Sequence, residues 1–481
     1  MNYIMHIFYL FREIQQVEIS LNLIENWLFF LYFFIINEVY MTLDLSKIAK
    51  QKKIEYFLIS YVDFFSVLRS KLVPAQAIKD MQKEGAGFAG FATYLDMSPA
   101  DPDMVSIPDP SSLIQLPWQS EIGWLAGDLW MDGKPVQSSP RVMLRNQINE
   151  LKKKNMFLKS GVECEYFLIS QDGNSIADEK DQAFKPCYDQ SALMRQYDLI
   201  KEICDCMIKL GWGPYQNDHE DANGQFEMNW DFSDCLTTAD RHVFFKFMVK
   251  TLAEKRGLRA TFMPKPFSNK TGNGCHAHVS VWNKKGQNIF LNKKDKLGLS
   301  KQAYNFIGGV MHSAEALTAW FNPTINSFKR INAPVTDSGA TWSPNTITYS
   351  GNNRTHMIRV PGSGRFELRL MDGAVNPYLL QAGIIAAGLD GVRYNRKPGK
   401  PVHVNMYEES HKVKNAKKLP KTLDIALSNL SQSKMMQKAF TKSTIESYVK
   451  LRKREIKQFK LSNESKKKGI TNWEKKNTLD C

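Results

Sequence analysis

Four arginines and one carboxylate lie close together in the last third of this 481-residue chain. Arg354 and Arg359 precede a Pro-Gly-Ser-Gly turn. Arg365, Glu367 and Arg369 follow it and alternate with apolar residues, which predicts a strand with all three charges on one face. Guanidinium groups suit phosphates and carboxylates, and a glutamate among them can hold a metal beside those phosphates. The alternative is a solvated strand with salt bridges.

Two glutamates upstream form a second candidate group. Glu163 and Glu165 lie on one face of a predicted strand, where like charges repel each other unless a cation lies beside them. Mg²⁺ or Mn²⁺ is the obvious candidate, because hard cations bind carboxylate oxygens. A structural pairing of the two side chains is the alternative.

Glu220 and Glu227 flank a turn that contains Gly224, and the alternative for these acids is a polar loop with a capping residue. His276 and His278 share one face of another predicted strand, which suits a metal or an anionic substrate, with ordinary packing as the alternative. Together with the arginines, these groups indicate phosphoryl transfer, in which divalent ions and arginines neutralise phosphate charge.

The composition fits an ordinary globular protein of two or three domains, with 43% hydrophobic and 23% charged residues. The net charge of +15 comes largely from surface lysine runs without interleaved aromatic residues, so we expect no nucleic acid partner. The seven cysteines have no Cys-x-x-Cys spacing, which indicates reduced thiols in a cytoplasmic protein.

The pattern along the chain predicts four segments. Residues 1–40 are a non-native or disordered extension before a natural start at Met41, because their apolar run is about half the length that spans a membrane. We therefore expect no membrane partner. Residues 41–140 are a small α+β domain that opens with a helix capped by Asp44 or Ser46. Residues 141–445 are a larger domain, and residues 446–481 are a basic helix with a frayed tail.

These blocks, in this order, resemble the glutamine synthetase family over nearly the whole span from residue 45 to residue 392. No Walker loop or kinase loop is present to support an unrelated kinase-like fold. The motifs that carry the resemblance are Glu163-Cys-Glu165, Gly224-Gln225-x-Glu227, Thr261-Phe-Met-Pro-Lys-Pro266, His276-Ala-His278, Asn322-Pro-Thr-x-Asn-Ser-Phe-Lys-Arg330, Asn353-Arg354, Ile358-Arg359-Val-Pro361, Arg365-Phe-Glu367-x-Arg369 and Asn376-Pro-Tyr378.

The resemblance implies a role for each matching residue. It implies two or three Mg²⁺ or Mn²⁺ ions per site, ATP as the nucleotide and glutamate as the acid substrate. The metal ligands are Glu165, Glu220 and Glu227 for one ion and Glu163, His276 and Glu367 for the second. Arg354, Arg359 and Arg365 bind the nucleotide phosphates, Phe232 and Ser280 line the adenine pocket, and Arg330, Arg369, His276 and the backbone of Gly272 bind substrate. Arg330, Arg354, Arg359 and Trp342 are the catalytic set.

The family architecture implied is α+β, with a β-grasp-like N-terminal domain and a larger catalytic α/β half-barrel. The subunits form homo-oligomeric rings with active sites between neighbours. The implied reaction joins the γ-carboxylate of glutamate to a small amine through γ-glutamyl phosphate. A catalytically inactive relative with a regulatory role is a remote alternative, since all six candidate metal ligands are present.

Two departures from the family pattern concern the amine. Trp342 stands where ammonia-using members carry a glutamate, and Ala89 stands where they carry an aspartate. A tryptophan face attracts alkylammonium and accommodates a methyl group. The chain therefore resembles the γ-glutamylmethylamide synthetase branch, labelled type III, which uses methylamine. The alternative is that Asp337 or Glu220 supplies the missing charge and ammonia is the amine.

Overall fold

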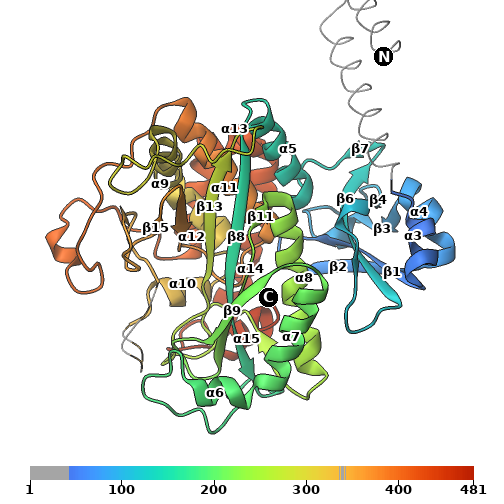
Figure 1. Ribbon diagram of the computed structural model, residues 1–481, viewed down its shortest axis with the longest axis horizontal. Coiled ribbons are helices and arrows are strands. Elements are labelled where there is room, and N and C mark those ends of the chain that lie inside the picture. The colour runs from blue at the N-terminus through green and yellow to red at the C-terminus, as the bar shows by residue number, and fades with distance from the viewer. Residues whose placement is uncertain (1–42, 335, 337, 339–340, 342) are drawn as a thin grey trace, which may run out of the picture.

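The structure is a computed structural model that describes residues 43–334, 336, 338, 341 and 343–481. The expectations for residues 1–40, Asp337 and Trp342 therefore lie outside the described residues. Within the described part, two sheets divide the chain into a sheet-rich N-terminal domain and a larger catalytic domain (Figure 1). The expected α+β fold class is confirmed.

The N-terminal domain is built on a seven-stranded sheet with the order β2-β1-β6-β4-β3, in which β5 and β7 also pair with β6. The predicted helix start is confirmed, because the Asp44 carboxylate accepts hydrogen bonds from the backbone N–H groups of Ser46 and Lys47. The elements are α3 (Leu45–Lys52), β1 (Tyr56–Val62), β2 (Leu68–Pro74), α4 (Ile78–Glu84), β3 (Ala86–Phe88), β4 (Met104–Pro108), β5 (Ile114–Gln115), β6 (Ile122–Met131) and β7 (Lys134–Pro135).

The catalytic domain is built on a nine-stranded sheet with the order β14-β15-β16-β13-β8-β10-β9, in which β11 and β12 also pair with β8. The long central strand β8 crosses most of the domain (Figure 1). The strands are β8 (Phe157–Ile169), β9 (Pro214–His219), β10 (Gln225–Trp230), β11 (Ser233–Asp234), β12 (Arg259–Thr261), β13 (Cys275–Trp282), β14 (Tyr349–Ser350), β15 (Ile358–Gly362) and β16 (Arg365–Leu368).

Helices cover one face of this sheet and leave the other face to charged side chains. Helix α8 packs against β8, and α11 packs against α5, α8 and α9. The helices are α5 (Pro140–Lys152), α6 (Gln190–Arg195), α7 (Tyr197–Lys209), α8 (Cys235–Glu254), α9 (Lys301–Phe321), α10 (Ser327–Ile331), α11 (Pro377–Arg393), α12 (Leu423–Gln432), α13 (Lys434–Phe440), α14 (Lys442–Leu461) and α15 (Asn472–Thr478).

A buried group of charges, here called the Arg141 cluster, joins the two domains. The Arg141 guanidinium donates to Asp240 on α8, to Asp128 on β6 and to Asp109 in the N-terminal domain, over 2.7–3.0 Å. Arg145 pairs with both Asp109 and Asp128. Since every carboxylate here has a guanidinium partner, the cluster forms an ion-paired link between the domains, although its three carboxylates exceed its two guanidinium groups by one charge.

The C-terminal residues are folded, so the expectation of a frayed tail is wrong. The Arg452 guanidinium on α14 donates to the carbonyl of Phe64 in the N-terminal domain over 3.0 Å. Beyond α15, Leu479 packs against Phe167 and Ile169 of β8. These contacts explain the order, because Arg452 and the apolar residues of the segment pack inward, while most of its lysines are exposed.

Candidate functional site

Three carboxylates lie in one row across three neighbouring strands. Glu227 on β10 is opposite Glu165 on β8 and opposite Asp218 on β9 in antiparallel register. Residues directly opposite each other in antiparallel strands project from the same face. The sheet therefore brings Glu165 next to two side chains that lie more than 50 residues further along the sequence.

A second row places histidines beside glutamates. His276 on β13 is opposite Glu163 on β8, and His278 is opposite Glu367 on β16. The His276 Nδ1 atom lies 3.6 Å from both Glu163 Oε2 and Glu367 Oε1, and its Nε2 atom lies 3.8 Å from Glu165 Oε1. His278 Nε2 lies 2.8 Å from Glu163 Oε1. His276 thus stands between the two rows.

We call the five carboxylates Glu163, Glu165, Asp218, Glu220 and Glu227 the acidic face. With His276 and Glu367 they form three overlapping groups whose ligand atoms lie within 4.8 Å of one another. The groups are Glu163, His276 and Glu367; Glu165, Glu227 and His276; and Asp218, Glu220 and Glu227. The predicted set of Glu163, His276 and Glu367 is thus a single group. The predicted set of Glu165, Glu220 and Glu227 is divided between the other two groups, one of which also includes Asp218.

The acidic face is short of positive charge. Burial, together with neighbouring carboxylates, raises the pKa of Glu220 and of Glu227 well above the usual range. Burial and the charges of Glu165 and Glu163 raise the pKa of Asp218 to about 6. Asp218 Oδ1 and His276 Nε2 are buried without a hydrogen-bond partner in the described structure. Hard divalent cations fit this set of oxygen and imidazole donors.

Glu367 differs from the acidic face because two arginines pair with it. Arg359 Nη1 donates to Glu367 Oε2 over 2.8 Å, and Arg369 Nη1 donates to the other oxygen. Burial alone would raise the pKa of Glu367, but Arg369 and His276 lower it to about 2. The carboxylate is fully buried, so β16 is not the solvated strand of the alternative interpretation.

Close packing around Gly272 and Gly274 places Arg330 beside His276 and Glu165. Arg330 on α10 is buried, and its Nη1 donates to the carbonyl of Leu370 over 3.3 Å. A Cβ atom on Gly274 would lie 2.8 Å from His276 Nε2, 2.9 Å from Arg330 Nη2 and 3.0 Å from Glu165 Oε1. A Cβ atom on Gly272 would clash with the carbonyl of Pro264 at 2.3 Å. Only glycine leaves room for these polar groups to meet.

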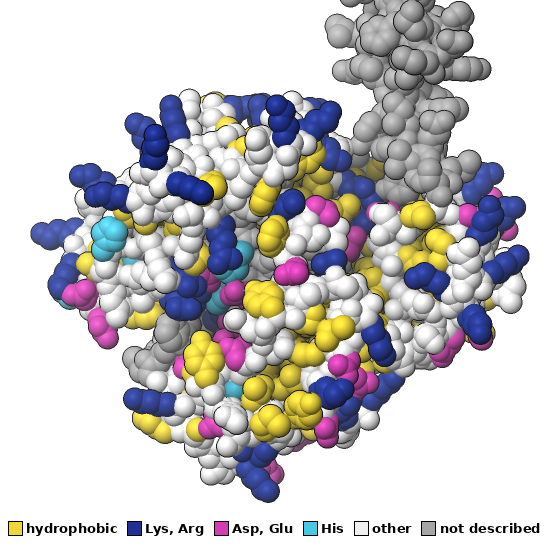
Figure 2. All heavy atoms as spheres, in the orientation of Figure 1, with side chains coloured by type: hydrophobic (Ala, Val, Ile, Leu, Met, Phe, Trp, Pro, Cys, Tyr) yellow, Lys and Arg dark blue, Asp and Glu magenta, His cyan; other side chains and the backbone are white. Residues whose placement is uncertain are grey.

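Arg354 and Arg365 lie at the exposed edge of the site and form no ion pair with described residues. Arg354 lines an open hollow of about 460 Å³ together with Asn353 and His403. Basic, acidic and histidine side chains gather near the middle of the view in Figure 2. The exposed arginines are therefore available to an anionic ligand.

Aromatic side chains form the other end of the face. The Phe232 ring lies nearly parallel to the Trp282 ring, with centroids 6.4 Å apart, and Lys159 Nζ lies 4.6 Å from the Trp282 centroid. Trp282 Nε1 donates to Ser280 Oγ over 2.9 Å. Phe232 is 55% exposed, so the pair offers an accessible flat surface that suits a planar ring.

Comparison with known proteins gives consistent matches. The family model described as "Glutamine synthetase, catalytic domain" matches residues 137–475. A glutamine synthetase of Rhizobium leguminosarum bv. phaseoli is 58% identical over 441 residues, which cover 92% of this chain and all of that protein. The chain belongs to the glutamine synthetase family.

Other members of the glutamine synthetase family carry a different name. A glutamate–methylamine ligase of Methyloversatilis universalis is 40% identical over 82% of this chain and 91% of that protein. A solved structure of a GmaS/ADP complex has a TM-score of 0.85 at 56% identity, covering 91% of this chain and all of that chain. Family members are ATP-dependent ligases that form carbon–nitrogen bonds and use divalent metals. None of the described helices is long and apolar enough to cross a membrane.

Sequence reasoning missed three residues that the structure places at the candidate site. Asp218 lies two positions before Glu220, a spacing that could have indicated a shared face. Trp282 follows Ser280 by two positions on β13, and Lys159 is opposite Ser280 on β8. Strand alternation alone could have placed Trp282, whereas Lys159 required knowledge of the register.

Proposed function

We propose that this chain joins the γ-carboxylate of glutamate to methylamine at the expense of ATP, by way of γ-glutamyl phosphate. The observation that carries the proposal is the acidic face, whose uncompensated carboxylates lie beside buried arginines. An unbalanced group of five carboxylates is costly to bury unless cations bind it, and arginines beside those cations suit phosphates.

The proposed metal ligands come from the three groups of neighbouring ligand atoms described above. Glu165, Glu220 and Glu227, now with Asp218, hold one Mg²⁺ or Mn²⁺. The second ion is held by Glu163, His276 and Glu367, with His278 fixing the position of Glu163 through its 2.8 Å contact. Bound divalent ions neutralise phosphate charge and orient the transferred group.

Arg330 and Arg369 are the proposed holders of the carboxylates of glutamate, together with the backbone of Gly272. Both guanidinium groups are buried, and Arg369 Nε has no hydrogen-bond partner in the described structure. A buried guanidinium donor without a partner favours a carboxylate ligand, which forms paired hydrogen bonds with it. Gly272 packs closely against the Arg330 side chain, which places its backbone beside that guanidinium-bearing residue.

ATP occupies the opposite end of the proposed site. Phe232 and Ser280 contact adenine, and the flat face of Trp282 extends this surface. Arg354, Arg359 and Arg365 contact the phosphates. Arg359 is held in place by bonds to Asn352 and Glu367, so its position is fixed before the nucleotide binds.

The proposed reaction has two steps. The γ-carboxylate of glutamate attacks the γ-phosphorus of ATP, the bond from that phosphorus to the β,γ-bridging oxygen breaks, and ADP leaves. Arg354, Arg359 and Arg365 stabilise the charge that develops on the phosphoryl oxygens. The amine nitrogen then attacks the acyl carbon, and phosphate leaves. Because only the neutral amine is a nucleophile, the bound alkylammonium ion loses its proton within the site.

The choice of methylamine rests on Trp342, which replaces a carboxylate in the family pattern, and on Ala89. Ser338, a described residue four positions before Trp342, donates to Asp221 Oδ2 over 2.6 Å, and Asp221 follows Glu220 of the acidic face in the sequence. The Methyloversatilis ligase and the GmaS structure also favour methylamine. Ammonia is the second candidate, favoured by the name of the Rhizobium relative.

Phosphate release with methylamine and with ammonium, each across a concentration series, tests the amine. We expect a higher kcat/KM for methylamine, and we expect Trp342→Glu to reverse that preference because a carboxylate attracts the smaller cation. A higher kcat/KM for ammonium in the wild-type enzyme would establish glutamine synthesis instead. Lack of turnover with either amine, despite ATP and glutamate binding, would favour the regulatory alternative.

We also propose that the chain forms a homo-oligomeric ring in which the N-terminal domain, including Ala89, completes the neighbour's site. Phe91 and Tyr94 beside it are 52% and 44% exposed, which suits a contact surface. Mass measurement in solution tests this. A mixed oligomer of an Ala89→Arg subunit and a Glu227→Gln subunit would recover activity only if sites form between subunits.

A further inference from the structure

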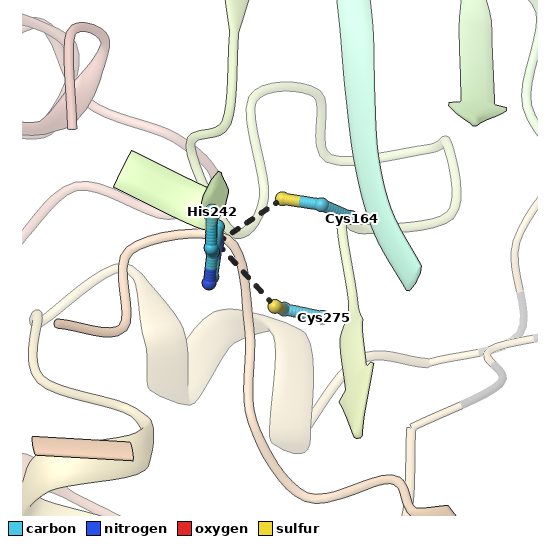
Figure 3. A group of neighbouring side chains, drawn as sticks. All are labelled: Cys164, His242 and Cys275. Carbon is cyan, nitrogen blue, oxygen red and sulfur yellow. Dashed lines mark hydrogen bonds between the residues drawn. The ribbon is translucent and has the colours of Figure 1, made fainter. Parts of the chain in front are cut away.

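Three side chains that can bind a metal, two cysteines and one histidine, meet on the side of the sheet that faces away from the acidic face. Cys164 on β8 lies between Glu163 and Glu165, so strand alternation directs its thiol into the core. Cys275 on β13 is its direct cross-strand neighbour. His242 comes from α8, which covers this side of the sheet (Figure 3).

The strand register holds the two thiols close together. The N–H of Glu165 donates to the carbonyl of Gly274 over 3.2 Å, which makes Cys164 and Cys275 a non-hydrogen-bonded pair. In such pairs the Cα atoms are about 4.5 Å apart, and the side chains are closer than in the alternate pairs. The two thiol side chains therefore lie close together on the core side of the sheet.

The distances fit one shared ion. His242 Nε2 lies 3.5 Å from Cys164 Sγ and 3.7 Å from Cys275 Sγ. The three ligand atoms lie within 4.8 Å of one another. Zinc bond lengths of about 2.3 Å to sulfur and about 2.0 Å to nitrogen, at tetrahedral angles, separate nitrogen and sulfur by about 3.6 Å. Hydrogen bonds between imidazole and thiol are the other arrangement with this spacing.

The donors and their surroundings favour a different metal from the one that suits the acidic face. Thiolate and imidazole select thiophilic cations, whereas carboxylates select Mg²⁺ and Mn²⁺. All three side chains are completely buried, so an ion here is closed off from solvent. The two sulfur atoms are the only hydrogen-bond partners of the His242 ring in the described structure, and its Nδ1 has none.

The geometry points to a second, structural metal site in which Cys164, Cys275 and His242 bind a thiophilic d¹⁰ cation, Zn²⁺ or Cu⁺. Such an ion would tie β8 and β13 to α8 directly behind the acidic face. Because the site is buried, the ion would enter as the chain folds and would exchange slowly afterwards. This inference is independent of the proposed reaction.

The full chain, produced under reducing conditions in media supplemented with Zn²⁺ or with Cu⁺, tests the inference. The purified wild type is dialysed against EDTA and then against Mg²⁺. Elemental analysis should then find about one Zn per chain from the Zn²⁺ medium or about one Cu per chain from the Cu⁺ medium. Ions on the accessible acidic face exchange and are removed by this treatment. Less than a tenth of an equivalent in both arms would overturn the inference.

Matched variants locate the ion. Cys164→Ser and Cys275→Ser should each lower the retained metal at least tenfold. Cys235→Ser, which changes another buried cysteine on α8, and Glu165→Gln on the acidic face should retain it. Equal metal content in the wild type and in both ligand variants would overturn the inference.

X-ray absorption on the wild type decides the question if a ligand variant fails to fold. Sulfur scatterers at about 2.3 Å from the retained metal are expected, together with nitrogen at about 2.0 Å. A shell of oxygen and nitrogen alone would place the ion elsewhere and overturn the inference.

Discussion

Two groups of carboxylates in this molecule are built in opposite ways. In the Arg141 cluster, three aspartates share two arginines, and each carboxylate accepts a hydrogen bond from a guanidinium. In the acidic face, five carboxylates lie near one another with no arginine bound to them in the described structure. The first group is complete as folded, whereas the second needs cations from outside.

The pKa values follow this difference. Burial opposes the ionisation of Asp109, yet Arg141 and Arg145 hold the pKa of Asp109 well below its usual range. Burial raises the pKa of Glu227, and the neighbouring Glu163 and Glu220 raise it further. We expect the cluster whose carboxylates are all paired with arginine to serve stability, and the cluster whose carboxylates are not paired with arginine to serve ligand binding. Four predictions test that distinction.

The largest effect is expected from Arg141→Met. It leaves Asp109, Asp128 and Asp240 without their shared partner, and removal of one member of a buried ion pair costs about 3–5 kcal/mol of unfolding free energy. Denaturant unfolding measures the loss. Arg145→Met is the matched control and should cost less, because the Arg145 side chain is 27% exposed. Equal losses would contradict the central role given to Arg141.

Glu227→Gln tests the other cluster. We expect kcat/KM to fall more than about 100-fold, since even residues that only support metal ligands contribute 10–100-fold. In metal-free buffer the melting temperature should stay the same or rise, because one charge leaves a repelling group. A large loss of stability with little loss of activity would reverse the assignment of the two clusters.

Mg²⁺ should stabilise the wild-type protein through the acidic face alone. At 100 times its Kd, an ion bound only to the folded state contributes about 2.7 kcal/mol, measured as a rise in melting temperature. The Glu165→Gln, Glu227→Gln double variant should lose the part of this response that comes from the ion held by Glu165, Glu220 and Glu227, and Arg141→Met should keep the full response. An undiminished response in the double variant would place the Mg²⁺ elsewhere.

The smallest expected effect is on the pH dependence of folding stability, to which Asp218 of the acidic face and Asp109 of the Arg141 cluster contribute with opposite sign. Asp218 has a pKa of about 6 when folded, raised from 3.8, so its contribution to stability is present below pH 3.8 and is lost as the pH rises through 6. Asp109 has a lowered pKa, so its contribution is present above pH 3.8 and is lost as the pH falls.

Metal-free unfolding measured from pH 4 to pH 7 separates these contributions. Relative to Asp218→Asn, the wild type should lose stability across this range, and saturating Mg²⁺ should abolish the difference because the cation favours the ionised carboxylate. Parallel curves for the two proteins without metal would show that Asp218 does not titrate in this range.

Four of the five carboxylates of the acidic face were singled out from the sequence, because the patterns that mark them are local. Alternation predicted the strand that carries Glu163 and Glu165, which is β8. The grouping of Glu163, His276 and Glu367 required the family resemblance, since no spacing links residues that are more than 90 positions apart. The structure then brought these three together.

The remaining features depend on tertiary contacts that leave no local pattern. Arg141 and Asp240 are 99 residues apart, and no local pattern links them. The cysteines showed no metal spacing because their meeting point depends on strand register and on His242 from a covering helix. The C-terminal residues looked like a solvated tail because their few apolar side chains are diluted by lysines.

The two-sided character of β8 has a consequence for its tolerance of insertions and deletions. Its odd-numbered positions 159–165 serve the charged face, and Cys164 serves the core. Adding or removing a single codon upstream of Glu163 would exchange the two faces, sending glutamates into the core and the thiol toward solvent. Among homologous genes, we expect in-frame length changes within this strand to be far rarer than amino-acid replacements, and a library of single-codon insertions measures this directly.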